Sequence, residues 1–348
     1  MIMKATTMKH FIALGLLTLV VSTMLSTAVS AQVPGPGPSA GGSPDAKFDA
    51  IIERLQAREG QDLKLYRELN DLLLDTPGLM ATIPGIVRSG QVSLATSDTL
   101  IFAIEDVGSP AAQTLLVSIL ADGGQRQMDR LRGVMALGAQ KAPTGATIDS
   151  LWAAAGQRFA PNDVDISNTA LLALGVIGDT LRVTSAPTYA PLRDGLVGWL
   201  HGAADPFERA MALKAIGNTH DAALGNDVAV YLFDSSVSSR ASAAQAIGMI
   251  RDGTKLHVLA GMLEDEPRGA VRAQVTEALR QIPADQASLQ AVLARVQFDP
   301  HPEARAQMVS YLVEHLGEFE QARDTLRTMT FKDPTKRVRM LASASLAD

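Results

Sequence analysis

The sequence predicts an all-α fold, a right-handed α-solenoid of stacked helix pairs. Three observations predict it: short segments recur with a period near 33 residues, arginine occupies one fixed position in most of them, and apolar residues follow the helical period. One pair of short amphipathic helices cannot bury its apolar stripe alone, but stacked pairs can. The chain has 348 residues, 47% of them hydrophobic, which is enough for a long array with a continuous core.

The N-terminus has the features of a secretory signal over residues 1–31. Lys4, Lys9 and His10 precede an apolar run over residues 11–25, and small residues follow it. We expect cleavage after Ala31, and the alternative is an uncleaved N-terminal anchor. The expected location is secreted or periplasmic, with no stable membrane span once the signal is removed.

The segment after the signal is rich in Pro and Gly. Residues 32–45 are expected to form a flexible leader, because Pro and Gly at this density do not propagate a helix or a strand. Residues 46–96 are expected to form an irregular helical part or degenerate repeats. Within them, residues 76–90 contain two prolines and three glycines and are interpreted as a kinked connection or a degenerate repeat.

The repeat is defined by a Leu or Ile near the end of each segment. The spacings between successive anchors are 37, 42, 31, 32, 33 and 34 residues, and the anchors are Leu137, Leu174, Ile216, Ile247, Leu279, Leu312 and Leu346. Seven residues before the anchor, six of the seven segments have arginine: Arg130, Arg209, Arg240, Arg272, Arg305 and Arg339. The exception is Ser167.

An acidic residue precedes most of these arginines by a short step. Three of these acids lie six residues before the arginine, namely Asp234, Asp299 and Asp333. Asp265 lies seven residues before Arg272, and Asp205 lies four residues before Arg209. Proline follows several of these acids, and an Asp-Pro pair ends one helix and begins the next. Each unit is therefore predicted to be two helices joined by an acidic turn.

This pattern of an acid, an arginine and an Ala/Leu-rich second helix resembles the HEAT repeat family over about residues 97–348. The resemblance implies a solenoid in which acids and arginines of adjacent repeats form a structural ladder. The residues implied are Asp234, Arg240, Asp265, Arg272, Asp299, Arg305, Asp333, Arg339, Arg209 and Arg130. The alternative is an arginine row that binds an anionic ligand.

Three segments are also similar to the helical horseshoe of vitellogenin-type large lipid-transfer proteins. They are residues 106–120, 210–234 and 304–318. The lipid-enclosing sheets and the N-terminal barrel of that family have no counterpart in this sequence. The likeness therefore supports the solenoid and makes an apolar-ligand carrier an alternative function.

The composition excludes several classes of function. The chain has no cysteine and a net charge of −6, which argues against thiol chemistry and against binding of nucleic acid. No His-rich metal spacing, nucleophile elbow or phosphate-binding loop is found, so we expect no catalytic residues, no cofactor and no metal. The glycines at 217 and 248 are interpreted as helix ends.

The function predicted from the sequence is non-catalytic binding of a protein or peptide partner. The surface expected to bind it is the concave row of second helices, or the loops at residues 139–165 and 178–188. Trp152, Trp199 and His220 are candidate partner-binding residues, and core packing is the alternative for both tryptophans. The rival functions are a lipid carrier and a HEAT-like lyase-type enzyme.

Overall fold

The computed structural model describes residues 43–58, 62–157 and 163–346. Every regular element in these ranges is helical. The longer helices are α2 (Pro44–Ala57), α3 (Leu63–Asp75), α5 (Leu94–Val107), α6 (Pro110–Ala121), α7 (Gln127–Gly138), α8 (Gly145–Gly156), α9 (Val164–Val183), α10 (Tyr189–Gly202), α11 (Pro206–Asn218), α13 (Val237–Ile250), α14 (Leu256–Asp265), α15 (Gly269–Arg280), α16 (Gln286–Val296), α17 (Pro302–Glu314), α18 (Glu320–Lys332) and α19 (Lys336–Ala344). The shorter ones are η1 (Pro77–Thr82), α4 (Ile83–Arg88), η2 (Ala222–Leu224), α12 (Gly225–Ala229), η3 (Val230–Phe233) and η4 (Gly253–Lys255). The prediction of an all-α solenoid is confirmed.

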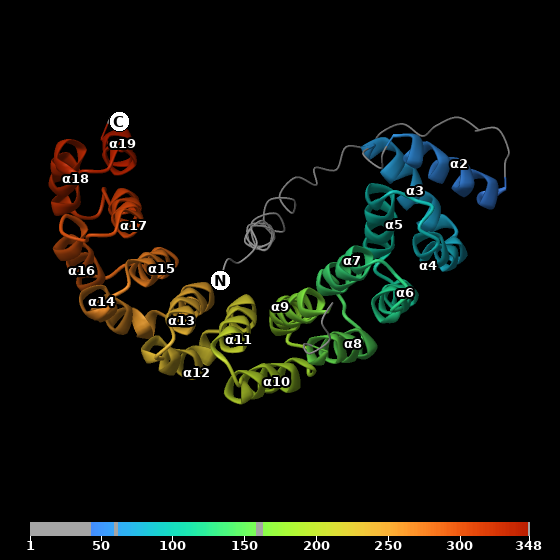
Figure 1. The fold of residues 1–348 in the computed structure, drawn as a ribbon, viewed down its shortest axis with the longest axis horizontal. Helices are drawn as coiled ribbons and strands as arrows, with labels where there is room; N and C mark the ends of the chain where they lie inside the picture. Colours follow the sequence, from blue (N-terminus) through green and yellow to red (C-terminus); the bar gives the residue numbers. More distant parts are fainter. Residues whose placement is uncertain (1–42, 59–61, 158–162, 347–348) are drawn as a thin grey trace, which may run out of the picture. The chain divides into compact units, whose positions relative to one another are not determined.

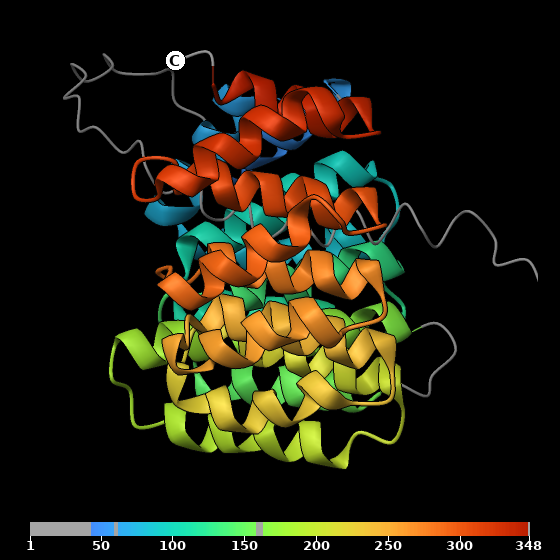
Figure 2. The same cartoon turned by 90° about the vertical axis from the view of Figure 1, so that its left-hand side faces the viewer.

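The helices of the unit that begins at Pro44 form two layers (Figure 1). The second helices of the pairs, α5, α7, α9, α11, α13, α15, α17 and α19, pack against one another in sequence order, and we call them the inner layer. The first helices, among them α6, α8, α10, α14, α16 and α18, lie behind them as the outer layer. Figure 2 shows the pairs stacked one upon the next. One hydrophobic core runs between the layers, as expected for stacked amphipathic pairs.

Glycine and alanine let the inner helices approach one another closely. A Cβ atom on Gly175 would lie 2.1 Å from the Ala215 carbonyl oxygen, and one on Gly248 would lie 2.7 Å from the Ala278 Cα atom. Gly217 makes a similar approach to Ala246. Gly175 lies in the middle of α9, and Gly217 and Gly248 lie in the last turns of α11 and α13. All three are inside helices, so their role is close packing, which the sequence interpretation of Gly217 and Gly248 as helix ends did not include. Because of this close approach, neighbouring helices of the inner layer lie closer to one another than neighbouring helices of the outer layer do. The inner layer is therefore locally the concave side (Figure 1).

The irregular N-terminal part is more helical than the sequence suggested. Helix α2 begins at Pro44, inside the segment assigned to the leader. Residues 77–88, interpreted as a kinked connection or a degenerate repeat, form the short helices η1 and α4. Pro77 and Pro84 are accommodated because they stand in first turns, where no amide donor is needed. The expected signal over residues 1–31 and the leader up to residue 42 lie outside the described residues.

Helix α9 corrects one expected loop. It continues to Val183, so the segment 178–183 of the expected loop 178–188 is helical. The helix is long because Ile177, Gly178 and Leu181 extend its buried face by another turn. By length and composition it is the one helix in the described ranges that could cross a membrane, but 61% of its apolar window is buried in the stack, as in a core helix.

Candidate functional site

Arginines at the repeat junctions join each inner helix to the next repeat. Three successive repeats share one arrangement, made by Arg240, Arg272 and Arg305. The Nη1 atom of each arginine donates to the backbone carbonyl six residues earlier, and its other guanidinium nitrogens bind a carboxylate just before the next inner helix. The carboxylate pairs are Arg240–Glu266 at 2.7 Å, Arg272–Asp299 at 2.5 Å and Arg305–Asp333 at 2.7 Å, and the carbonyl bonds go to Asp234, Glu266 and Asp299 at 2.9, 2.7 and 2.7 Å. These contacts tie three helices together at each junction.

The junction carboxylates also bind the backbone just before the following helix. Asp299 accepts a hydrogen bond from the His301 amide at 2.8 Å, and Asp333 accepts one from the Thr335 amide at 2.8 Å. Each acid therefore satisfies an amide that a helix N-terminus leaves without an intrahelical partner. The side chain of the acid thus holds the previous inner helix, and its backbone carbonyl accepts from the arginine six residues later, which explains the fixed distance between the two residues.

The prediction that Asp265 belongs to the ladder is wrong. Asp265 is exposed, and the partner of Arg240 is Glu266, whose side chain is buried. The six-residue step found at Asp234, Asp299 and Asp333 points to Glu266 before Arg272, so the sequence did contain the signal. At the neighbouring junction Arg209 pairs with Asp234 at 3.3 Å.

Two arginines at the limits of this series make different contacts. Arg130 of α7 pairs with Asp163, the residue before α9, at 2.7 Å, and donates to the Leu120 carbonyl. The sequence offered no acid for Arg130, because Asp163 follows a long insertion. Arg339 of α19 donates to the Asp333 carbonyl at 2.7 Å. It therefore has the same bond to the carbonyl six residues earlier as the other junction arginines.

The ion pair of Arg272 and Asp299 is the most deeply buried of these contacts. Both residues are 2% exposed. Burial raises the pKa of the Asp299 carboxyl, but hydrogen bonds from Arg272, the His301 amide and Arg295 outweigh it, so this pKa lies below its ordinary value. The carboxylate stays ionised, and a buried ion held in this way depends on all of its partners.

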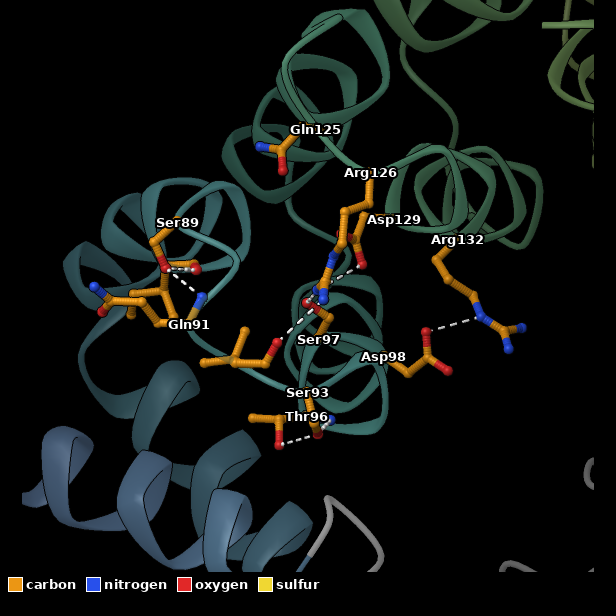
Figure 3. Close-up of polar contacts among 12 residues, drawn as sticks. Ser89, Gln91, Ser93, Thr96, Ser97, Asp98, Gln125, Arg126, Asp129 and Arg132 are labelled. Atoms are coloured by element: carbon orange, nitrogen blue, oxygen red, sulfur yellow. Dashed lines mark hydrogen bonds and ion pairs between the residues drawn. The ribbon is translucent and has the colours of Figure 1, made fainter. Parts of the chain in front are cut away.

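The N-terminal junction replaces the regular pattern with a local network (Figure 3). Arg126, the residue before α7, binds the buried Asp129 with its Nε atom at 2.5 Å. It also donates to the Ser97 hydroxyl at 2.6 Å and to the Val92 carbonyl at 3.1 Å. Arg126 thus fixes the start of α5 to the start of α7. The sequence pattern did not reveal this arginine, because it stands four residues before the repeat position of Arg130.

A second contact in Figure 3 lies on the exposed side of α5 and α7. Arg132 donates from Nε to Asp98 at 2.9 Å and lies 5.8 Å from the centre of the Phe102 ring. Its Nη1 atom is 3.7 Å from the sulfur of Met135. Burial raises the pKa of Asp98 although Arg132 opposes the shift. The guanidinium therefore stands between an acid, an aromatic ring and a thioether on the inner face.

The accessible positions of the inner helices divide into two halves. From α5 to α13 they include a set of apolar side chains that are exposed or half-buried: Phe102, Met128, Met135, Val176, Phe207 and Met249. Neighbouring helices bury the other faces of these helices, so these side chains belong to the inner face. Two of them, Met128 and Phe207, are 37% and 46% exposed. Aromatic residues and methionine are typical of binding surfaces.

The other half of the inner face is polar. On α15 and α17, Arg280 binds Glu277 and Gln307 at 2.7 and 3.1 Å and also contacts Glu314. Arg280 follows the anchor Leu279, the position at which the preceding repeats have glycine. The change from glycine to arginine therefore marks the point where close helix packing gives way to a charged network.

Of the three candidate partner-binding residues, the two tryptophans lie together and His220 lies elsewhere. Trp152 on α8 and Trp199 on α10 pack together in the outer layer, with ring centres 5.8 Å apart, and both rest on the core. Trp199 also lines a cavity of about 250 Å³. His220 lies after α11 with a positive φ of 48° and stands 3.4 Å from Asp179. The structure thus gives both tryptophans a packing role.

Glu105, on the same stripe of α5 as Asp98 and Phe102, supplies a pH-dependent prediction. Burial, with Asp106 beside it, raises the pKa of Glu105 to about 7 from 4.5. Because the pKa is higher in the folded state than in the unfolded state, the protonated Glu105 carboxyl favours folding. Its contribution to the free energy of unfolding is complete below about pH 4.5 and is lost as the pH rises through 7. We expect Glu105→Gln to stabilise the protein by about 3 kcal/mol at pH 8 and to flatten the pH dependence of the free energy of unfolding between pH 5 and 7. Urea titrations at several pH values measure it. The exposed Glu53→Gln is the control, and an unchanged slope would contradict the assignment.

Among the residues that the structure describes, no group of three His, Asp or Glu side chains is placed to hold a metal ion. The accessible apolar side chains over α5 to α13 and the charged network over α15 and α17 make the inner face the candidate functional surface.

Comparisons with known proteins support the repeat architecture. Residues 193–280 match the family of HEAT repeats. The solved structure of lipovitellin is similar with a TM-score of 0.58 and 16% identity over 88% of this chain and 33% of that chain. The structure of human deoxyhypusine hydroxylase in complex with glycerol has a TM-score of 0.32 and 22% identity, over 79% of this chain and 98% of that chain. A chain of the Pds5–Scc1 complex has a TM-score of 0.37 and 12% identity, over 87% of this chain and 56% of that chain. The comparison with curated proteins gives no match. The chain spans about a third of the length of the lipovitellin chain, and that likeness establishes the fold alone.

Proposed function

We propose, from the premise that the chain is an α-solenoid of HEAT-like repeats, that it is a non-catalytic scaffold that binds a protein partner on its inner face. The observation that carries the proposal is the row of accessible apolar side chains over α5 to α13, continued by the charged network of Arg280. A core of aromatic and Met side chains beside polar groups is the usual composition of a protein interface. The features of residues 1–31 support a secreted or periplasmic location for this scaffold.

A charge placed in the apolar half tests the proposal. We expect Met135→Glu or Val176→Glu to weaken partner binding at least about tenfold, because a carboxylate would have to be buried in the interface. Both side chains are half-buried, so we expect the free energy of unfolding to change by about 1 kcal/mol at most. Binding is measured by crosslinking and capture with the protein from Gln32 in a native envelope extract. The partner is then identified, and its affinity for each variant is determined.

The matched control is Ser118→Glu, which adds the same charge at an exposed position of the outer helix α6. It should leave binding unchanged. Equal losses for Ser118→Glu and Met135→Glu, or no loss for either inner-face variant, would place the contact elsewhere.

A lipid carrier is the second candidate, and the observation in its favour is the fold shared with lipovitellin. It predicts that lipid co-purifies with the protein and that the same inner-face variants reduce the bound lipid. Extraction followed by mass spectrometry measures this. A delipidated sample with unchanged stability and unchanged partner binding would remove the lipid function.

A further inference from the structure

Two phenylalanines protrude at adjacent repeat junctions. Phe298 follows α16 and is 80% exposed, and Phe331 is the next-to-last residue of α18 and is 84% exposed. They are the two most exposed large apolar side chains among the described residues. Each stands just before the ladder acid of its junction, Asp299 or Asp333. A single exposed apolar residue is normal on a protein surface, but two at the same place in adjacent repeats indicate a contact surface.

Arg305 fixes these two junctions to one another. Its Nη1 atom donates to the Asp299 carbonyl at 2.7 Å, and its Nε atom binds the Asp333 carboxylate at 2.7 Å. The inner helices that follow the two junctions, α17 and α19, also pack against each other (Figure 1). Phe298 and Phe331 therefore lie on one edge of the solenoid, where the outer helices end and the inner helices begin. A buried ion pair holds this edge together.

The same part of the chain is basic, although the chain as a whole is acidic. Residues 320–346 contain six Lys and Arg residues against three Asp and Glu residues, whereas the chain has a net charge of −6. One of the three acids, Asp333, is already bound by Arg305. Lys332 and Lys336 are exposed, and no acidic side chain pairs with either of them among the described residues. Two ammonium groups therefore remain available within five residues of Phe331.

We propose that this edge docks on the surface of an anionic lipid bilayer. Phe298 and Phe331 insert among the acyl chains, and Lys332 and Lys336 contact the lipid phosphate groups. Contacts of this kind combine the burial of apolar side chains with electrostatic attraction to anionic lipids. The long lysine stem lets the ammonium group stay at the headgroup level while the neighbouring ring enters the apolar region.

An acidic surface of a protein is the competing partner. A ring that is almost fully exposed needs a complementary hollow in a folded protein, whereas a fluid bilayer closes around it without a preformed pocket. The isolated, protruding position of Phe298 and Phe331 therefore favours lipid. The proposal does not involve the inner face, so it is independent of the scaffold function.

Sedimentation with lipid vesicles tests the proposal. The protein from Gln32 is used, because the apolar run over residues 11–25 would itself bind lipid. Vesicles of equimolar phosphatidylglycerol and phosphatidylcholine should bind the protein at least about tenfold more tightly than vesicles of phosphatidylcholine alone. Salt at about 0.5 M should remove most of this difference, because it screens the lysine–phosphate attraction. Equal binding to the two kinds of vesicle, or no binding to either, would overturn the proposal.

Two double variants locate the contact. Phe298→Ser with Phe331→Ser should weaken binding to the anionic vesicles about tenfold, because two apolar rings are lost from the lipid contact. Lys332→Gln with Lys336→Gln should weaken it by a similar factor and reduce its salt dependence. All four side chains are exposed, so the urea midpoint should stay unchanged. Vesicle binding that survives both double variants would refute this site.

Phe233→Ser is the matched control. Phe233 is 73% exposed and also stands just before a ladder acid, but the acidic turn of Glu264 and Asp265 lies between its junction and that of Phe298. The substitution should change vesicle binding by less than about twofold. A loss equal to that of the phenylalanine double variant would show that the lipid contact is not at this edge.

Two further results separate the possible partners. Met135→Glu should leave vesicle binding unchanged, so a failure of the inner-face scaffold function would not affect this result. If the phenylalanine double variant bound vesicles like the parent protein but lost partner capture from the envelope extract, the edge would contact a protein. That outcome would overturn the lipid assignment.

Discussion

Asp299→Asn is expected to lower the free energy of unfolding by about 3–5 kcal/mol. The substitution keeps the volume of the side chain but removes the charge opposite Arg272, which is 2% exposed and cannot turn to water. It also weakens the capping acceptor for the His301 amide. An uncompensated buried guanidinium is what makes the effect large, and urea unfolding followed by circular dichroism measures it.

The control is an exposed ion pair between α17 and α19. Glu303 of α17 binds Arg337 at 2.6 Å, but the two side chains are 42% and 66% exposed. Glu303→Gln should change the free energy of unfolding by less than about 1 kcal/mol. The double variant Arg272→Met with Asp299→Leu should recover much of the loss, because an apolar pair leaves no buried charge. If Asp299→Asn and Glu303→Gln lower the free energy of unfolding by similar amounts, burial does not determine how much a ladder ion pair contributes to stability.

Gly175→Ala is expected to destabilise the protein by about 3 kcal/mol, although alanine is the better helix former. The new methyl group would meet the Ala215 carbonyl oxygen at 2.1 Å and the Asn218 Cβ atom at 2.9 Å. Both belong to α11 and one is backbone, so no side-chain rotation relieves the contact. Helices α9 and α11 would have to move apart, which opens the core beneath them.

Gly198→Ala on α10 is the matched control. Nothing lies within 4 Å of a Cβ atom at this position, and the residue is helical. The substitution should therefore stabilise the protein by about 0.5–1 kcal/mol through the lower entropy of the unfolded chain. Thermal and urea unfolding of the two variants should move in opposite directions. A stabilising effect of Gly175→Ala would show that the inner helices can separate without loss.

The sequence predicted the architecture well because the repeat carries its own periodic signal. The anchors of Leu and Ile, the arginines and the acids recur with each helix pair, so each repeat supports the interpretation of its neighbours. The errors came where a single repeat departs from the register. Asp265 and Glu266 are adjacent acids that look alike in sequence, and only the six-residue step to the arginine identifies Glu266 as the ladder residue.

The functional surface was harder to predict than the fold. The inner face depends on which side of each helix its neighbours leave open, and residues such as Phe102 and Val176 have no mark that separates them from core residues. The rarity of tryptophan in the sequence marks Trp152 and Trp199 as candidates, yet the two pack on each other in the outer layer. Arg126 was missed because its role arises from contacts between helices that are some 30 residues apart in the chain.

Each repeat contacts chiefly the repeats next to it. Energetic effects of a substitution therefore fade within a repeat or two, in contrast to a globular core where one change is felt throughout. A consequence is evolutionary independence: the apolar stretch around Met135 and the charged stretch around Arg280 can diverge separately, each adapting to a new ligand while the other keeps its own sequence.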